Sequence, residues 1–258
     1  MHANFHTHTY RCGHAEGNEK EYVARAVQAG LKTLGFSDHT PYDFFDLGPR
    51  NRPMRMKPEE LEGYAESIRR LSDLNADRIQ LRLGVEAEYY PRYFFRTLNL
   101  LRDNGIEYMI LGQHFLGNEV DGPYTGRATE DPAILSRYVS QTDEALRSGL
   151  FTYFAHPDLI HFCGECSVYE REIRKLCRTA RETDTPLEIN LLGIREGRHY
   201  PNEQFWRIAG EEGCVAILGC DAHRPEDTAD PESEEKARAL ASRCGVPILD
   251  SPVLKPIF

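Results

Sequence analysis

Short apolar runs alternate with longer segments of helical periodicity along the whole chain. The apolar runs are rich in Val, Ile and Leu, and they predict strands at residues 2–6, 31–37, 79–86, 107–113, 151–156, 186–190, 214–220 and 246–249. Amphipathic segments lie between them, as in residues 58–74, where Leu61, Tyr64, Ile68 and Leu71 recur at helical spacing. This order is typical of βα units around a parallel sheet, and seven or eight such units predict a barrel.

Glycine and proline residues mark where the predicted helices begin and end. Pro58 suits the first turn of its helix, and Gly30 and Gly105 follow the helical segments 19–29 and 91–104 where a left-handed cap is expected. Two stretches with Gly and Pro but no sustained period, 40–57 and 115–130, predict long loops. Both follow the C-terminal end of a predicted strand, where barrel enzymes build their sites.

The length and the composition restrict the class of protein. A chain of 258 residues suits one barrel, so we expect a single domain over residues 1–258. No apolar run approaches the ~20 residues that a membrane span needs, and the start MHANFHTHTY is polar, so we expect neither a signal peptide nor a membrane anchor. A net charge of -10 argues against a nucleic-acid partner, because such surfaces need clustered Lys and Arg.

The cysteines indicate a reduced compartment. Seven are scattered through the chain, an odd number without a secretory signal, so we expect a cytoplasmic protein. Cys163 and Cys166 form one CxxC pair, but a second pair is absent, and any zinc or redox role of these two thiols stays open.

Histidines and carboxylates gather where the predicted strands end. Seven of the ten histidines lie at or just past such an end, and Glu86 and Asp221 occupy similar positions. The histidines are His6, His8, His14, His39, His114, His156 and His223. Because the C-terminal ends of barrel strands meet at one mouth, these nine residues predict a metal centre.

The donor types limit the choice of metal. Alternation along an extended chain places His6 and His8 on one face, and likewise Asp221 and His223. Imidazole nitrogen combined with carboxylate oxygen favours Zn²⁺, Mn²⁺ or Fe²⁺ over Ca²⁺ or Mg²⁺. Nine candidate ligands exceed the need of one ion, so more than one divalent ion is expected.

These motifs resemble those of the PHP (polymerase and histidinol phosphatase) superfamily, and the resemblance covers nearly the whole chain. The segments HTHTYRCGH, GFSDHTPY, GVEAEYY, LGQHFL and LEINLLGIREGRHYP are similar to the histidinol-phosphatase branch. The resemblance implies a distorted (β/α)7 barrel with a trinuclear metal site. It implies one ion held by His6, His8, Glu86 and Asp221, a second held by Glu86, His114 and His156, and a third held by His14, His39 and His223.

The resemblance also implies a reaction, the hydrolysis of the phosphomonoester L-histidinol phosphate in histidine biosynthesis. A hydroxide that bridges metal ions would attack phosphorus, and Asp221, His223 or a metal-bound water would protonate the leaving alkoxide. Two alternatives stay open: a phosphoesterase acting on another small phosphomonoester or a nucleotide, and a non-catalytic metal-binding module. The sequence does not indicate an oligomeric state.

Several residues near the ligands are candidates for further roles. Arg195, after the predicted strand 186–190, is expected to bind the phosphate and stabilise its charge in catalysis, with Arg198 and Arg11 as weaker candidates. Glu88 shares the face of Glu86 and is expected either to accept a hydrogen bond from a ligating imidazole or to contact a cationic substrate group.

The remaining polar and aromatic residues fit structural roles at least as well. Asp38 would point away from His39, and Asp158 could orient an imidazole or cap a turn. Three histidines are expected at the surface: His2, His161 and His199. Four aromatic residues are expected in the core or at its rim: Tyr89, Tyr90, Phe205 and Trp206.

Overall fold

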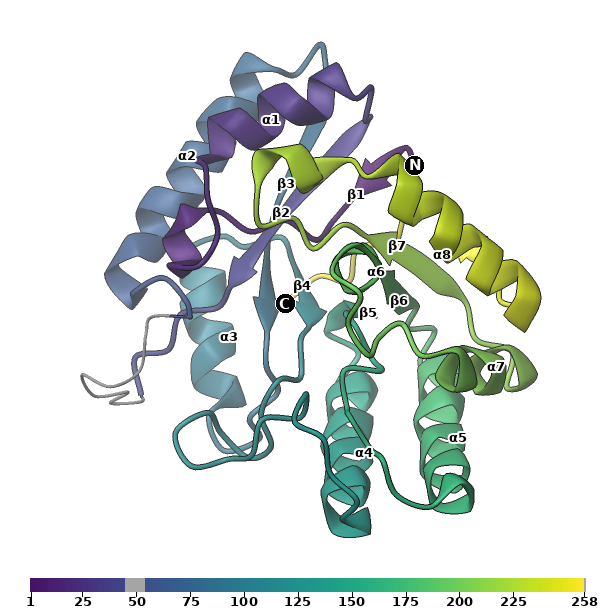
Figure 1. Cartoon of the computed structure of the whole chain (residues 1–258). Helices are drawn as coiled ribbons and strands as arrows, with labels where there is room; N and C mark the ends of the chain where they lie inside the picture. Colours follow the sequence, from purple (N-terminus) through teal and green to yellow (C-terminus); the bar gives the residue numbers. More distant parts are fainter. Residues whose placement is uncertain (45–53, 258) are drawn as a thin grey trace.

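Eight parallel strands form the sheet of this computed structural model, which describes residues 1–44 and 54–257 (Figure 1). The strands lie side by side in chain order, and each neighbouring pair is parallel. They are β1 (Ala3–Asn4), β2 (Thr33–His39), β3 (Gln80–Ala87), β4 (Tyr108–Leu111), β5 (Phe151–Phe154), β6 (Leu187–Asn190), β7 (Ala216–Gly219) and β8 (Ile248–Leu249).

Helices connect the strands and cover the outside of the sheet (Figure 1). They are α1 (Glu19–Gln28), α2 (Leu61–Leu74), α3 (Phe94–Asp103), α4 (Pro132–Arg147), α5 (Cys166–Glu182), α6 (Leu191–Arg195), α7 (Glu203–Glu211) and α8 (Pro231–Cys244). Three short 3₁₀ helices add to them: η1 (Tyr10–Cys12), η2 (Pro58–Glu60) and η3 (Pro225–Thr228). The apolar stripe predicted for α2 is buried in the main core, as expected for an amphipathic helix.

The barrel closes between the first and the seventh strand. Thr7 forms a parallel bridge with Ala222, where the His8 amide donates to the Ala222 carbonyl at 2.9 Å and the Ala222 amide donates to the His6 carbonyl at 3.2 Å. The eighth strand pairs only with the beginning of β7, so it extends the sheet outside this ring. The prediction of a distorted seven-stranded barrel is therefore confirmed, with residues 248–249 as an end extension.

Aromatic and aliphatic side chains fill the base of the barrel. Tyr108 occupies the space left by Gly35 and Gly84 on neighbouring strands, where a β-carbon would collide with its ring. Its hydroxyl donates to the carbonyl oxygens of Phe5 and Phe36 at 3.1 and 2.9 Å. The polar residues of the strand ends therefore lie above a packed floor, at the mouth of the barrel.

The predicted elements agree with the structure, with one correction at the N-terminus. The regular strand there is Ala3–Asn4 rather than residues 2–6, because the Asn4 side chain accepts hydrogen bonds from the backbone amides of His6 and Cys220. Gly30 and Gly105 have φ of 78° and 63°, as their predicted caps require. The predicted loop 115–130 contains neither helix nor strand, and the predicted loop 40–57 lies in part outside the described residues.

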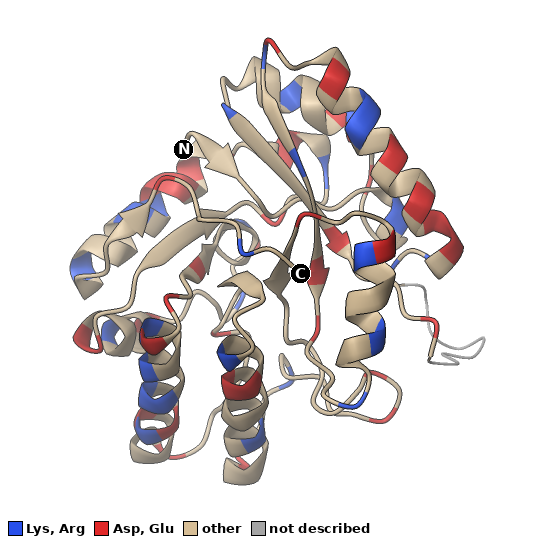
Figure 2. Cartoon of the chain, turned by 180° about the vertical axis from the view of Figure 1, so that it is seen from behind, with Lys and Arg blue, Asp and Glu red and all other residues tan. Residues whose placement is uncertain are grey.

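Basic and acidic residues are interspersed along the helices (Figure 2), and several of them form ion pairs. On α5, Arg174 pairs with Glu211 and Glu212, and Arg178 pairs with Glu212 at 2.9 Å. Such paired cations differ from the clustered, free Lys and Arg residues that bind a phosphate backbone. None of the helices in residues 1–44 and 54–257 is long and apolar enough to cross a membrane.

Candidate metal centre

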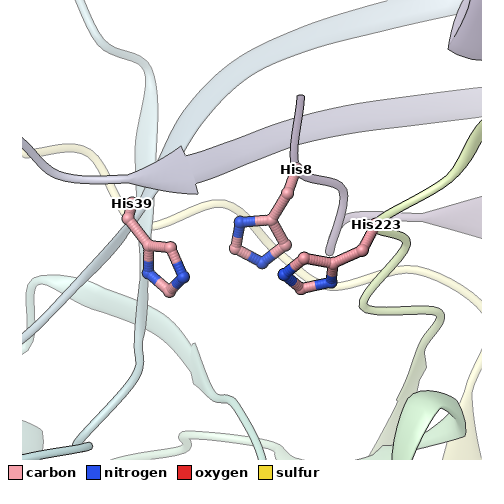
Figure 3. Close-up of side chains that lie close together, drawn as sticks. All are labelled: His8, His39 and His223. Carbon is pink, nitrogen blue, oxygen red and sulfur yellow. The ribbon is translucent and has the colours of Figure 1, made fainter. Parts of the chain in front are cut away.

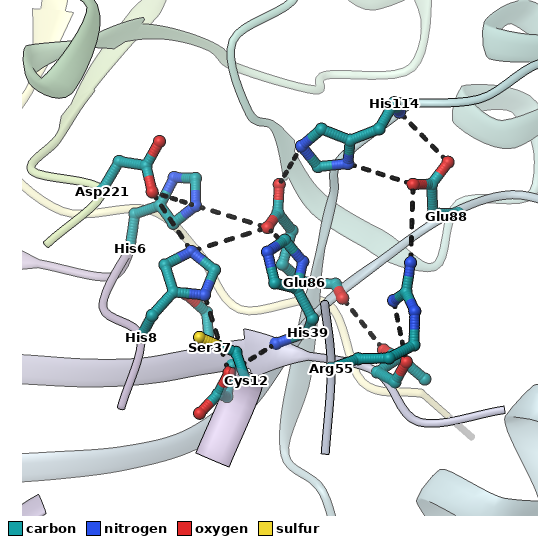
Figure 4. Close-up of polar contacts among 12 residues, drawn as sticks. His6, His8, Cys12, Ser37, His39, Arg55, Glu86, Glu88, His114 and Asp221 are labelled. Carbon is teal, nitrogen blue, oxygen red and sulfur yellow. Dashed lines mark hydrogen bonds and ion pairs between the residues drawn. The ribbon is translucent and has the colours of Figure 1, made fainter. Parts of the chain in front are cut away.

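The strand ends bring all nine predicted ligands to one place at the barrel mouth, and Figure 4 shows His6, His8, His39, Glu86, His114 and Asp221 among them. A pocket of about 610 Å³ opens there. Eight of the nine line it, whereas His6 lies fully buried beneath them. The eight are His8, His14, His39, Glu86, His114, His156, Asp221 and His223.

Four ligand atoms surround one point at the floor of this pocket. Nε2 of His6 lies 3.7 Å from Oε2 of Glu86 and 3.4 Å from Oδ1 of Asp221. Nε2 of His8 lies 3.6 and 3.1 Å from the same two oxygens. All four atoms are buried and lack a hydrogen-bond partner. Buried polar atoms without partners are costly, so they indicate a missing ligand.

The spacing of these atoms fits a divalent metal ion. Ligand bonds of ~2.0–2.2 Å at tetrahedral angles separate neighbouring donor atoms by roughly 3.3–3.6 Å. The four distances, 3.1 to 3.7 Å, scatter about this range. The residues therefore fit an ion of the kind that the donor types predict.

Glu86 faces two groups of imidazoles with its two oxygens (Figure 4). While Oε2 faces His6 and His8, Oε1 lies 2.9 Å from Nε2 of His156 and 3.6 Å from Nε2 of His114. Burial opposes ionisation of Glu86, but the surrounding imidazoles hold the pKa of its carboxyl well below its usual value. A carboxylate in this position can bind one ion with each oxygen.

Further imidazoles lie on the open side of His8 (Figure 3). The His8 ring lies 4.3 Å from the His223 ring and 4.5 Å from the His39 ring, between centroids. Nε2 of His14 lies 3.0 Å from Nε2 of His223, and the His14 and His39 rings are 5.3 Å apart. Burial, together with repulsion by His8, lowers the pKa of His14, of His39 and of His223, the last to about 3. Neutral imidazoles of this kind are the form that binds metal.

Carboxylates lie beside the other ring nitrogen of three of the imidazoles. Nδ1 of His6 is 2.8 Å from Glu188, Nδ1 of His114 is 3.0 Å from Glu88, and Nδ1 of His8 is 3.7 Å from Asp38. Carboxylates that hydrogen-bond Nδ1, as beside His6 and His114, orient the ring so that Nε2 would be free to bind a metal ion. Burial opposes protonation of His8, but Asp221 and Asp38 outweigh it and raise its pKa to about 9.

The backbone is strained at two of the proposed ligands. His156 and Asp221 have φ of 32° and 47°, in the left-handed region that non-glycine residues rarely adopt. Two glycines also make room for carboxylates, since a β-carbon at Gly112 would collide with Glu86 and one at Gly219 with Glu188. Strain and close approach of this kind are typical of functional sites.

Sequence reasoning missed Glu188. Its carboxylate is fully buried and accepts hydrogen bonds from the His156 amide at 2.9 Å and the Asn190 side chain at 3.0 Å, beside its contact with His6. Asn190 also donates to Asp221 at 3.1 Å. The signal in the sequence is one glutamate within the apolar strand LEIN, at a position two residues before Asn190.

Three predicted carboxylates take defined positions. Glu88 is 2% exposed and its oxygens face His114 and backbone amides, so the geometry favours the role of imidazole partner and does not support the predicted substrate contact. Asp38 does not line the pocket; its carboxylate lies beside Nδ1 of His8 and accepts from both the amide and the hydroxyl of Thr9. Asp158 orients no imidazole; it accepts from the Asn202 amide and the Trp206 indole, and burial raises its pKa to about 7.

Arginines line the upper wall of the pocket, and each is paired with a carboxylate that also lines it. Arg195, at the end of α6, lies at this wall as predicted. The ion pairs join Arg195 to Asp227 at 3.3 Å, Arg198 to Glu196 at 2.7 Å and Arg224 to Glu16 at 3.7 Å. The predicted candidate Arg11 instead pairs with Glu19 and does not line the pocket.

The residues expected outside the site do lie outside the pocket lining. His2 is exposed, but His161 and His199 are half-buried and stack on each other with 4.0 Å between ring centroids, so their placement at the surface was wrong in part. His199 also contacts the Leu159 carbonyl at 2.8 Å, which helps to hold its ring away from solvent. The aromatic residues are buried except Tyr89, which is half-buried at the core edge.

The two thiols of the CxxC pair, Cys163 and Cys166, are free and exposed.

The comparisons with known proteins agree with this geometry. The PHP domain family matches residues 4–191. A "Probable histidinol-phosphatase" of Deinococcus radiodurans is 32% identical over 231 residues, covering 85% of each chain. A protein of the same name in Schizosaccharomyces pombe is 24% identical over 272 residues, covering 93% of this chain and 86% of the relative.

A solved structure shares the fold. It is histidinol phosphate phosphatase from Lactococcus lactis in complex with zinc, L-histidinol and phosphate, with a TM-score of 0.74 at 18% identity, covering 96% of this chain and 95% of the other. At this identity the similarity is one of architecture. The match over residues 4–191 and the relative that is 32% identical over most of both chains show that the chain belongs to the PHP domain family.

Proposed function

We propose that this protein hydrolyses L-histidinol phosphate to L-histidinol and phosphate, as a step of histidine biosynthesis, at a centre of three divalent ions. The observation that carries the proposal is the set of four buried ligand atoms without partners, on His6, His8, Glu86 and Asp221. The relatives named as histidinol-phosphatases support the choice of substrate. The seven cysteines are all free, as is typical of proteins in a reducing compartment, and this supports a cytoplasmic location.

The ligands are proposed to hold the ions in the three groups that the family resemblance implies, and Zn²⁺, Mn²⁺ or Fe²⁺ would suit each group. When bound, such ions neutralise charge on phosphoryl oxygens and activate water for attack. The first group is His6, His8, Glu86 and Asp221, the second Glu86, His114 and His156, and the third His14, His39 and His223.

The chain supplies binding and orientation of the substrate from the upper wall. Arg195 is proposed to contact the phosphoryl group, because it lines the pocket and a guanidinium can donate to two phosphate oxygens. Its partners Asp227 and Asp230 hold the guanidinium in place at 3.3 and 3.1 Å. Paired arginines and carboxylates suit a substrate that carries both an anionic phosphate and a protonated amine.

The chain also provides groups that can move the proton to the leaving alkoxide. Asp221 and His223 both line the pocket, and Nδ1 of His223 lies 3.1 Å from the Asp221 carbonyl. Protonation of the leaving oxygen is proposed for Asp221, His223 or a metal-bound water, all of which would reach the open pocket.

A panel of substrates tests the proposal. Purified, metal-loaded protein is assayed with L-histidinol phosphate, glycerol phosphate, nucleoside monophosphates and an aryl phosphate. The proposal requires the highest kcat/KM for L-histidinol phosphate. A higher value for another phosphoester would replace the substrate, and tight metal binding without turnover of any ester would identify a non-catalytic module.

A further inference from the structure

A buried arginine lies behind the metal centre, outside the pocket lining. Arg55 is 7% exposed and lies in the described part of the segment between β2 and α2. It donates to the Thr40 carbonyl at 2.9 Å. Its guanidinium forms a two-pronged ion pair with Glu119 and stacks on Tyr42, with 4.7 Å to the ring centroid. Two long loops are thus joined at one cation.

The same guanidinium reaches the carboxylate behind His114 (Figure 4). Nη2 of Arg55 lies 3.9 Å from Oε1 of Glu88, the oxygen that faces Nδ1 of His114 at 3.0 Å. The other oxygen of Glu88 accepts from the amides of His114 and Phe115, both at 3.1 Å. Among the described residues, Arg55 is the basic residue whose side chain lies within 4.0 Å of the Glu88 carboxylate.

The chain of contacts ends at a ligand atom. With Nδ1 turned to Glu88, Nε2 of His114 faces Oε1 of Glu86 at 3.6 Å, and Nε2 of His156 lies 2.9 Å from the same oxygen. The orientation of His114 therefore depends on where the Glu88 carboxylate is held. Arg55 attracts that carboxylate from the side opposite the imidazole.

We propose that Arg55 is a positioning residue of the metal centre, which acts through Glu88 on His114 and thereby on the ion between Glu86, His114 and His156. This inference rests on the metal centre of the proposed function, but not on the identity of the substrate. It gives the Arg55 guanidinium a function in the site through its contact with Glu88, beyond its ion pair with Glu119.

A double-mutant cycle on metal affinity tests the inference. Arg55→Met, Glu88→Gln and the double variant are titrated with Zn²⁺ against a chromophoric chelator, without substrate. We expect Arg55→Met to weaken one of the three bound equivalents by about tenfold, the lower range for outer contacts of metal ligands. The double variant should bind no more weakly than Glu88→Gln, because Arg55 acts through Glu88. Additive losses, or three equivalents at parental affinity in Arg55→Met, would overturn the inference.

Control variants separate the charge from the loop contact and from general effects. Glu119→Gln removes the loop partner but keeps the cation, and it should retain parental Zn²⁺ affinity; a loss equal to that of Arg55→Met would overturn the inference. Arg96→Met removes an exposed ion pair, in which Arg96 lies 2.8 Å from Asp43, and it should leave the Zn²⁺ affinity unchanged. If Arg55→Met does not fold, Arg55→Gln replaces it in the cycle with the same expectations.

The outcomes also separate this inference from the proposed function. Failure of the parent protein to bind Zn²⁺ would remove the metal centre itself. Parental affinity in the Arg55 variants, with the parent binding three equivalents, would remove only the role of Arg55.

Discussion

Nε2 of His8 lies 3.1 Å from Oδ1 of Asp221, and neither buried atom has a hydrogen-bond partner. The two residues come from opposite ends of the chain, and the bridge between Thr7 and Ala222 that closes the barrel brings them together. Closure of the barrel and assembly of the metal centre are therefore the same structural event. An ion between the two atoms would link the first strand to the seventh.

Removal of metal should abolish activity and destabilise the fold. Chelation followed by dialysis should reduce turnover to background, and Mn²⁺, Zn²⁺, Fe²⁺ or Co²⁺ should restore it, because the ions activate the attacking water. A ligand that binds only the folded state at 100 times its Kd adds about 2.7 kcal/mol of stability, so Tm should fall on chelation. Full turnover in protein shown to be metal-free by elemental analysis would contradict this prediction.

Glu86→Gln should lose at least one metal equivalent and lower kcat by orders of magnitude. The reason is that both oxygens of Glu86 face imidazoles of different groups, and an amide can supply only one oxygen. Metal content by elemental analysis and steady-state kinetics check it. His161→Ala is the control and should keep all metal, since His161 stacks on His199 outside the pocket lining.

Gly112→Ala should resemble a mild form of Glu86→Gln. Its β-carbon would overlap Oε1 of Glu86, so the carboxylate has to move away from His114 and His156. We expect weaker metal binding with a folded protein, measured by chelator competition and circular dichroism. Gly63→Ala in α2 is the matched control, since its β-carbon would meet only Arg11 at 3.9 Å. Equal metal affinity in both variants would contradict the prediction, because it would show that the added β-carbon does not displace the Glu86 carboxylate.

Arg195→Ala should lower kcat/KM for L-histidinol phosphate by one to two powers of ten. Loss of a charge-assisted contact commonly costs ~1.5–3 kcal/mol. Arg195→Lys should recover part of the loss, because an ammonium keeps the charge but not the planar fork. Arg195 also pairs with Asp227 and Asp230 in the loop after Asp221, so metal content must be measured in both variants. Parental kcat/KM in Arg195→Ala would exclude the contact.

Metal binding should release protons at neutral pH. The pKa of His8 is raised to about 9 in the metal-free protein, so His8 is protonated at pH 7 and must lose its proton to bind an ion. Metal affinity should therefore rise as the pH increases from 7 toward 9. Calorimetric titration with Zn²⁺ in two buffers of different ionisation enthalpy measures the protons released. Identical apparent enthalpies in the two buffers would contradict this prediction.

The sequence predicted the strand ends and their ligands because both depend on local patterns. Each apolar run corresponds to a strand. The residues at the strand ends, such as Glu86 and His156, are of types that bind metal ions, so the sequence alone identifies them as candidate ligands. The resemblance to a known family supplied the grouping of ligands, which no local pattern contains. The irregular path after Asn4 was not predictable, because its cause is a contact of that side chain with Cys220, far along the chain.

The outer residues of the site could not be predicted for the same reason. Glu188 and Arg55 act only through the tertiary fold: one lies under His6 from the sixth strand, and the other reaches Glu88 from a loop without periodicity. A buried charge shows its role only when its partner is known. Such residues read as ordinary polar positions in the sequence.

We propose that a metal centre at this barrel mouth hydrolyses L-histidinol phosphate. The most direct test is phosphate release from that substrate by one preparation of protein, measured before chelation, after chelation and after Zn²⁺ or Mn²⁺ is returned. We expect turnover, its loss and its recovery to follow the amount of bound metal, with kcat/KM above that for glycerol phosphate. No turnover of L-histidinol phosphate by protein with three bound equivalents would contradict it.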